Sequence, residues 1–157
     1  MANLLRPLRN RAASGYMPVV SPSIWVRKTL TFTGAAGLGL VGAVPLFNLT
    51  GRVKVDHIIP HCTVDLVSGG GGSLALGVTG LTSLFLGATV ATTIDLGDWW
   101  VNTTPVAIAA AQIAAFKDIL INASIIGTVS GFDITAGVII FDVGYTPLTD
   151  DGALVAA

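Results

Sequence analysis

The chain has 157 residues, of which 52% are hydrophobic and 11% are charged, with a formal net charge of −1. The charged share is less than half the roughly 25% of an ordinary soluble domain. The acidic residues are nine aspartates with no glutamate, and 19 glycines accompany them. Exposed helices are usually coated with glutamate and lysine, so this composition argues against a helical protein. A surface so poor in charge favours burial against other subunits.

The basic residues are concentrated at the N-terminus. Residues 1–28 hold five basic residues and no acidic one, whereas residues 29–157 hold three basic residues and nine aspartates. Pro7, Pro18 and Pro22 limit any helix here to a turn or two, so we expect a basic extended N-terminal arm over residues 1–28. A basic arm on an acidic body predicts docking to an acidic partner. The residues expected to contact that partner are Arg6, Arg9, Arg11, Trp25, Arg27 and Lys28.

The rest of the chain consists of short segments in which apolar and polar residues alternate between glycine-containing turns. Strands are expected over 29–33, 44–49, 52–67, 73–79, 83–86, 88–94, 119–126, 128–134 and 138–145. The alanine-rich stretch Val106–Phe116 is the one segment that favours a short helix. The pattern predicts an all-β fold, a sandwich or jelly-roll-like body of about eight to ten short strands. This body covers 29–147, and 148–157 forms a C-terminal tail.

A long uncharged stretch in the middle of the chain raises the question of a membrane span. No charged residue lies between Leu66 and Ile94. Leu74, Leu76 and Val78 alternate with small residues, which is the period of a strand. The glycines in this stretch also disfavour a helix. We therefore expect buried strands and no membrane contact, and we keep a small membrane-associated protein as the second alternative.

One glycine motif has the spacing of a cofactor loop. The segment Gly37–Gly42 matches the G-x-G-x-x-G pattern of dinucleotide sites. That chemistry needs a helix whose N-terminus faces the pyrophosphate, but Pro45 and β-forming residues follow here. We expect no cofactor, and we interpret the glycines as bends where another chain packs closely.

His57, His61 and Cys62 are the only soft metal ligands in the chain. On a strand the two histidines share one face and Cys62 points to the other, and a zinc site usually needs four ligands. The aspartates Asp95 and Asp98 flank a turn, where such residues commonly bond the backbone. We therefore expect no metal, no catalytic residue and no enzymatic activity. As the only cysteine, Cys62 excludes an intrachain disulfide and indicates a reducing compartment.

Trp99 and Trp100 are adjacent in a loop, and neighbouring residues on a strand point to opposite sides. One indole is therefore expected to pack inside and the other to meet a partner. Stacking on a carbohydrate is the alternative use of an exposed tryptophan. Both residues are candidate partner-binding residues.

Three segments resemble small bacteriophage virion proteins of the head decoration or cement type: Thr29–Val55, the DLGDWW sequence of Asp95–Trp100, and Gly137–Val155. The resemblance lies in glycine turns, threonine-rich strands and the ending PL-x-x-DG. It implies a β-sandwich, often trimeric, that sits on the major capsid protein and has no catalytic residues.

The function expected from the sequence is that of a capsid decoration protein. The body forms a homotrimer through protein–protein contacts, and the arm fastens it to the major capsid shell of a virion after synthesis in the host cytoplasm. Five basic residues beside an acidic body make a weak nucleic-acid footprint, so no direct nucleic-acid contact is expected. The alternative is a head-fibre or tail component that binds a glycan or a partner protein.

Overall fold

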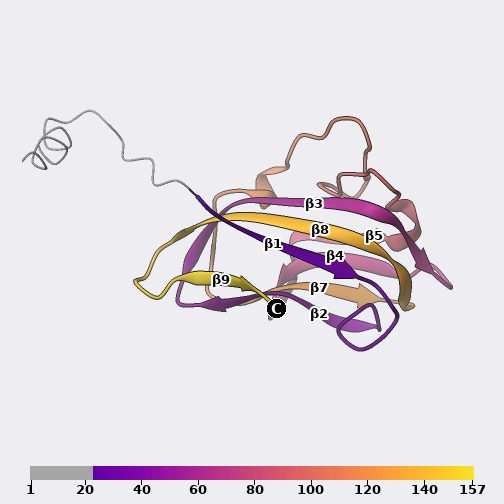
Figure 1. The fold of residues 1–157 in the computed structure, drawn as a ribbon, viewed down its shortest axis with the longest axis horizontal. Helices are drawn as coiled ribbons and strands as arrows, with labels where there is room; N and C mark the ends of the chain where they lie inside the picture. Colours follow the sequence, from indigo (N-terminus) through magenta and orange to yellow (C-terminus); the bar gives the residue numbers. More distant parts are fainter. Residues whose placement is uncertain (1–22) are drawn as a thin grey trace, which may run out of the picture.

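The protein is an all-β sandwich, in which residues 23–157 form nine strands in two antiparallel sheets (Figure 1). A computed structural model describes residues 23–157. The first sheet has the order β1-β8-β3-β6, with β1 (Ile24–Thr31), β8 (Ile134–Pro147), β3 (Val53–Ser68) and β6 (Ile119–Ile121). The second sheet has the order β5-β4-β7-β2-β9, with β5 (Leu81–Val90), β4 (Ser73–Val78), β7 (Ile125–Ser130), β2 (Gly42–Thr50) and β9 (Ala153–Ala156).

The hydrophobic core lies between the two sheets and is made by the inward half of each alternating strand. In β7, for example, Ile125, Gly127 and Val129 are buried, and the residues between them are more exposed. Such alternation places one face of each sheet inside and the other outside. The largest fully buried side chains include Trp100, Phe32, Phe47, Phe85, Phe116 and Phe141.

The expected sandwich is confirmed, and so is the number of strands. The uncharged middle of the chain forms β4 and β5, and no helix in residues 23–157 is long and apolar enough to cross a bilayer. Strand β1 begins at Ile24, inside the range assigned to the arm, and β9 lies inside the expected tail. Strand β8, with 14 residues, is longer than the expected 138–145, whereas the 16 residues of β3 match the expected length.

The prediction of a helix over Val106–Phe116 is wrong. Only a three-residue 3-10 turn forms there, Ala114–Phe116, and another 3-10 turn covers Ala91–Thr93. Val106 instead exchanges backbone hydrogen bonds with Trp99. Packing along this stretch is uneven, because Ile108 is 97% exposed whereas Phe116 is fully buried. Most helical stability in proteins comes from the packing of an apolar face, so the intrinsic preference of alanine does not decide the structure here.

The segment after β5 covers an edge of β3. Strand β6 pairs with Val53–Val55, and no other strand of residues 23–157 pairs with β3 on that side. Backbone bonds from the segment fill the gap: Cys62 N donates to Asp98 O at 2.8 Å and Trp100 N donates to Pro60 O at 3.1 Å. This strand-like contact sends Trp100 into the core and leaves Trp99 on the outer side.

Candidate functional site

The outer face of the first sheet carries two tryptophan–histidine pairs in register. We call this surface the aromatic face and define it as Trp25, Arg27, His57, Ile59, His61 and Trp99. The backbone pairing sets three rows across β1, β8 and β3, which are Trp25–Gly144–His57, Arg27–Asp142–Ile59 and Thr29–Ile140–His61. A β-bulge between Val55 and His57 fixes which residues point outward, because it leaves Ile58 buried and His57 exposed.

Trp25 lies flat on the sheet because its neighbour in β8 has no side chain. A Cβ atom at Gly144 would lie 3.1–3.3 Å from three atoms of the indole ring. The indole thereby reaches across β8 to His57, with ring centroids 6.0 Å apart and planes 10° apart. Glycine opposite an aromatic residue commonly supports such cross-strand packing. The Trp25 side chain remains 54% exposed, so its outer face is open to solvent.

The second pair is His61 and Trp99, of which Trp99 borders a small cavity. The two ring centroids are 4.4 Å apart with planes tilted by 30°. The cavity has a volume of about 260 Å³ and is lined by Ile59, Trp99, Val101, Ala110 and Gln112. Gln112 Nε2 donates to Ile58 O at 2.7 Å, and its Oε1 accepts from His57 Nδ1 at 3.3 Å. Gln112 therefore connects the cavity to the Trp25–His57 pair.

An ion pair lies between the two aromatic pairs. Arg27 donates Nε and one terminal nitrogen to the two carboxylate oxygens of Asp142, at 2.7 and 2.8 Å. This hydrogen-bonded, charged contact raises the pKa of Arg27 further above its ordinary value. Two-pronged pairing holds both side chains in one geometry, so the middle row presents a neutralised pair instead of a free charge.

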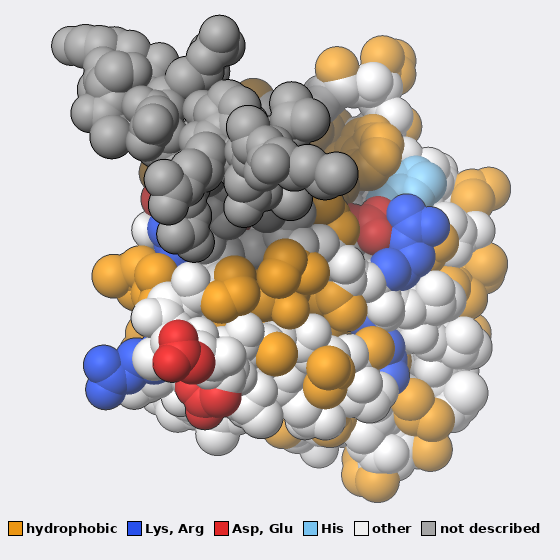
Figure 2. All heavy atoms as spheres, turned by 60° about the vertical axis from the view of Figure 1, so that its left-hand side comes forward, with side chains coloured by type: hydrophobic (Ala, Val, Ile, Leu, Met, Phe, Trp, Pro, Cys, Tyr) orange, Lys and Arg blue, Asp and Glu red, His pale blue; other side chains and the backbone are white. Residues whose placement is uncertain are grey.

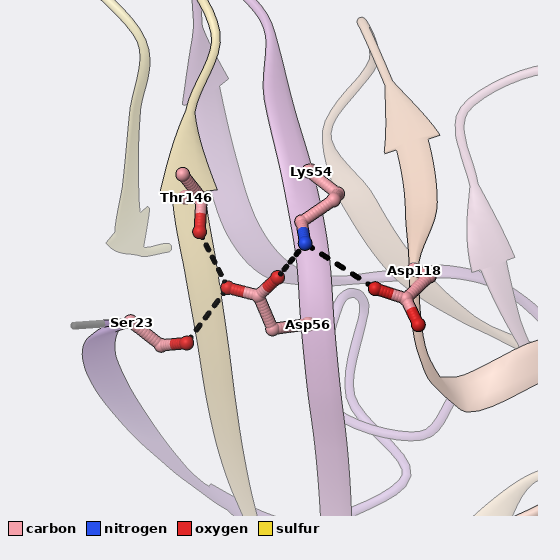
Figure 3. A network of polar contacts seen from close by, with 5 residues as sticks. All are labelled: Ser23, Lys54, Asp56, Asp118 and Thr146. Carbon is pink, nitrogen blue, oxygen red and sulfur yellow. Dashed lines mark hydrogen bonds and ion pairs between the residues drawn. The ribbon is translucent and has the colours of Figure 1, made fainter. Parts of the chain in front are cut away.

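A second polar group lies at the start of β1 and is centred on Asp56 (Figure 3). Asp56 Oδ2 accepts hydrogen bonds from Ser23 and Thr146, each at 2.7 Å, and Oδ1 pairs with Lys54 at 2.7 Å. Lys54 also contacts Asp118 at 3.2 Å. Burial alone would raise the pKa of Asp56, but the bonds from Lys54, Thr146 and Ser23 outweigh it and lower that pKa. The network attaches the residue before β1 to β3 and β8.

At the opposite end of the sandwich, six exposed apolar side chains form a surface that we call the apolar end. Ile134 N donates to Gly39 O at 2.8 Å, and Thr135 Oγ1 donates to Val67 O at 3.4 Å, which joins three separate segments. Asp65 and Asp133 are the only charged residues in segments 34–42, 64–73 and 130–136. The members of the apolar end are Leu38, Leu40, Val41, Val64, Val67 and Phe132.

The end where β1 begins differs from the apolar end in its charge. Apolar side chains lie across it together with acidic and basic ones (Figure 2), and the Lys54–Asp56 and Lys54–Asp118 ion pairs lie at the start of β1. A cavity of about 450 Å³ there is lined by Arg52, Leu120, Ile121, Asn122, Leu148 and Thr149. Its lining brings one guanidinium, one amide and one hydroxyl together with apolar side chains, so no convergent chemistry points to a ligand.

The candidate metal ligands lie on opposite faces of β3, as the strand pattern predicted. His57 and His61 point outward, whereas the Cys62 side chain is fully buried. Within residues 23–157 no three His, Cys, Asp or Glu side chains lie close enough to hold a metal ion. Asp98 Oδ2 accepts from Asp95 N at 3.1 Å, as expected of turn aspartates.

The glycine motif forms a tight loop between β1 and β2, with positive φ at Gly37, Gly39 and Gly42. The strand β2 follows it directly, and a Cβ atom at Gly39 would overlap the carbonyl oxygen of Ile134. These glycines are bends, and at Gly39 the close neighbour is the backbone of Ile134 in the same chain.

The predicted partner-binding residues fall into different places. Trp25 and Arg27 lie on the aromatic face, and Lys28 points to the other side, where its ammonium group donates to Ala157 O. Trp99 is half-buried and Trp100 is 0% exposed, so only Trp99 is available to a partner. Arg6, Arg9 and Arg11 lie outside the described residues.

Sequence reasoning missed the grouping of His57, His61 and Gln112 with Trp25 and Trp99. The alternation of His57, Ile59 and His61 along β3 was the available signal for one shared face. Nothing local to residue 112 indicated that its amide reaches β3. Comparisons with protein-family models, curated proteins and solved structures found no match for the chain.

Proposed function

We propose that the protein is a structural subunit of a virion, a capsid decoration protein that works as a homotrimer. The observation that carries the proposal is the apolar end, where six large apolar side chains on three hydrogen-bonded segments are each 41–55% exposed. Exposed apolar surface of this kind on a small domain marks an interaction site. In this proposal the apolar end joins copies of the chain, and Arg6, Arg9 and Arg11 of the arm contact the major capsid protein.

Energetic considerations favour several weak contacts over one strong contact. Each side chain of the apolar end is about half-exposed. Burying the exposed half of one side chain contributes about 1 kcal/mol to association, so burying all six contributes about 6 kcal/mol. The entropic cost of association is about 4–15 kcal/mol, so one such contact alone is weak. A closed trimer forms several of these contacts at once, and three arms on one body raise the effective affinity for a shell.

The test combines mass measurement with shell binding. Sedimentation of the purified protein should give a trimer mass, and the protein should co-sediment with empty shells of the virus or prophage that encodes it. Phe132→Asp places a charge in the apolar end and should give monomers that bind shells at least about tenfold more weakly.

A matched control is available at the other end of the sandwich. Leu81, the first residue of β5, is 56% exposed, and Phe132 is 55% exposed. Leu81→Asp should therefore keep the mass and the shell binding of the original protein. A monomer at all concentrations, or a Phe132→Asp variant with unchanged mass, would overturn the proposal.

A further inference from the structure

We propose that the aromatic face binds a neutral oligosaccharide, with Trp25 and Trp99 as stacking rings and the cavity beside Trp99 as the main sugar subsite. This inference does not rest on the proposed virion function. The aromatic face also differs in chemistry from the apolar end, because on the aromatic face flat rings alternate with polar groups.

The first support is the way in which Trp25 is held. A sugar ring presents a face of C–H groups, which packs on a flat aromatic ring whose own face is open. Trp25 meets this need, since Gly144 and His57 hold the indole parallel to the sheet while 54% of the side chain stays exposed. Such a ring is already ordered before binding, which lowers the entropic cost of association.

The second support is the cavity, which offers hydrogen-bonding groups with fixed orientation. The Gln112 amide uses one N–H toward Ile58 O and one oxygen lone pair toward His57. An amide has two N–H donors and two acceptor positions, so one of each remains for a ligand. A sugar hydroxyl both donates and accepts, and it matches this pair. Trp99 forms the apolar wall of the same cavity.

The charge of the face indicates a neutral ligand. Arg27 and Asp142 neutralise each other through two hydrogen bonds in the middle row. An anionic ligand would be expected to meet an unpaired cation. The apolar end fits a protein partner better than the aromatic face does, because its exposed apolar side chains come from segments that hold only two charged residues. Alternating flat rings and neutral polar groups fit a sugar chain.

The spacing of the two aromatic rows sets the length of the ligand. The rows of Trp25 and His61 are four residues apart along β8, which is about 13 Å at the usual rise of a strand. One sugar cannot reach across this distance, whereas a short oligosaccharide can contact both rings. A monosaccharide should therefore bind at least about tenfold more weakly than an oligosaccharide that spans both rows.

The experiment uses the full chain on an array of neutral and acidic oligosaccharides, followed by calorimetry with the best neutral ligand. Trp25→Ala and Gln112→Ala remove an exposed ring and a cavity amide, and each should weaken binding at least about tenfold. Phe132→Ala, in the apolar end, is the matched control and should leave binding unchanged. Circular dichroism and thermal unfolding establish that each variant is folded.

Three results would overturn the inference. The first is that no neutral oligosaccharide binds on the array or in calorimetry, and the second is that folded Trp25→Ala and Gln112→Ala bind as tightly as the original protein. The third is that only acidic sugars bind and that high salt abolishes this binding. The two proposals fail separately. Phe132→Asp tests the trimer without touching the aromatic face, and Trp25→Ala tests the sugar site without touching the apolar end.

Discussion

At the residue scale, identical side chains serve different purposes according to depth. Trp100 is sealed in the core, where its indole Nε1 donates to Thr89 Oγ1 at 2.9 Å and its ring meets Phe141 edge-on. Trp99, one residue earlier, is half-buried against His61, and Trp25 is mostly exposed. The backbone bond from Trp100 to β3 decides this division, because it fixes which side of the sheet edge each indole occupies.

Cys62 is expected to be chemically inert in the folded protein. Burial raises the pKa of its thiol to about 11, and Sγ donates to Val64 O at 3.1 Å. The thiolate is the reactive form, so native protein at pH 8 should not react with a thiol reagent over the time in which a free cysteine reacts fully. Denaturation in urea should release one thiol per chain. Rapid labelling of the native protein would show that the β3 edge opens readily.

At the element scale, the attachment of β1 depends on Asp56. Strand β1 is an edge strand that pairs only with β8, and Ser23 before it bonds to Asp56. Replacing Asp56 by asparagine removes the charge that Lys54 faces and weakens the bonds from Ser23 and Thr146. We expect a loss of about 1–3 kcal/mol in the free energy of unfolding at pH 7, measured by urea titration.

The same residue predicts a pH dependence. Its folded pKa is lowered from the ordinary value of 3.8, so its stabilising effect is present above that value and is lost as the pH falls through the folded pKa. The difference in stability between the original protein and Asp56→Asn should therefore shrink below pH 3.8. Asp118→Asn, at the exposed partner of the same lysine, should cost less than about 0.5 kcal/mol. A constant difference from pH 7 to pH 3 would contradict this assignment.

The elements differ in how far the sequence determines them. Alternation along Leu74–Val78 and Val138–Tyr145 predicted strands that the structure confirms. The alanine run at Val106–Phe116 predicted a helix that is absent, because backbone bonds to Trp99 and the burial of Phe116 outweigh local preference. The bulge at Asp56 was also not predictable, since it depends on pairing with β8.

The aromatic face could not be predicted from the sequence, for a related reason. Trp25 and His57 stack only because β8, from the far end of the chain, lies between β1 and β3 and places Gly144 beneath the indole. Sequence alone identified Trp25, Trp99 and Trp100 as anchors. It did not specify strand order, and strand order decides which anchors share a face.

At the scale of the whole molecule, the two ends of the sandwich have different chemistry. The apolar end holds the β7–β8 turn, whereas β1 and the Asp56 network begin at the other end (Figure 1). Opposite ends of the molecule can therefore contact different partners. This polarity agrees with a body that joins copies of itself and an arm that contacts a shell.

The arm contribution is testable through charge alone. Replacing Arg6, Arg9 and Arg11 by glutamine removes three of the five positive charges of residues 1–28 and leaves every described contact in place. Shell binding should weaken at least about tenfold, and its sensitivity to salt between about 50 and 500 mM should fall. The variant should keep the trimer mass. Shell binding with unchanged salt dependence would show that the arm charges are not used.

The depth of the three tryptophans gives the molecule an optical property that needs no added label. An aqueous quencher such as iodide reaches an indole on the surface and does not reach one in the core, so Trp25 emission should be quenched and Trp100 emission protected. A molecule resting on Trp25 would shield it and reduce the quenchable share of the fluorescence. Unfolding would instead expose the protected share, so occupancy of the sheet surface and integrity of the core can be followed separately in one cuvette.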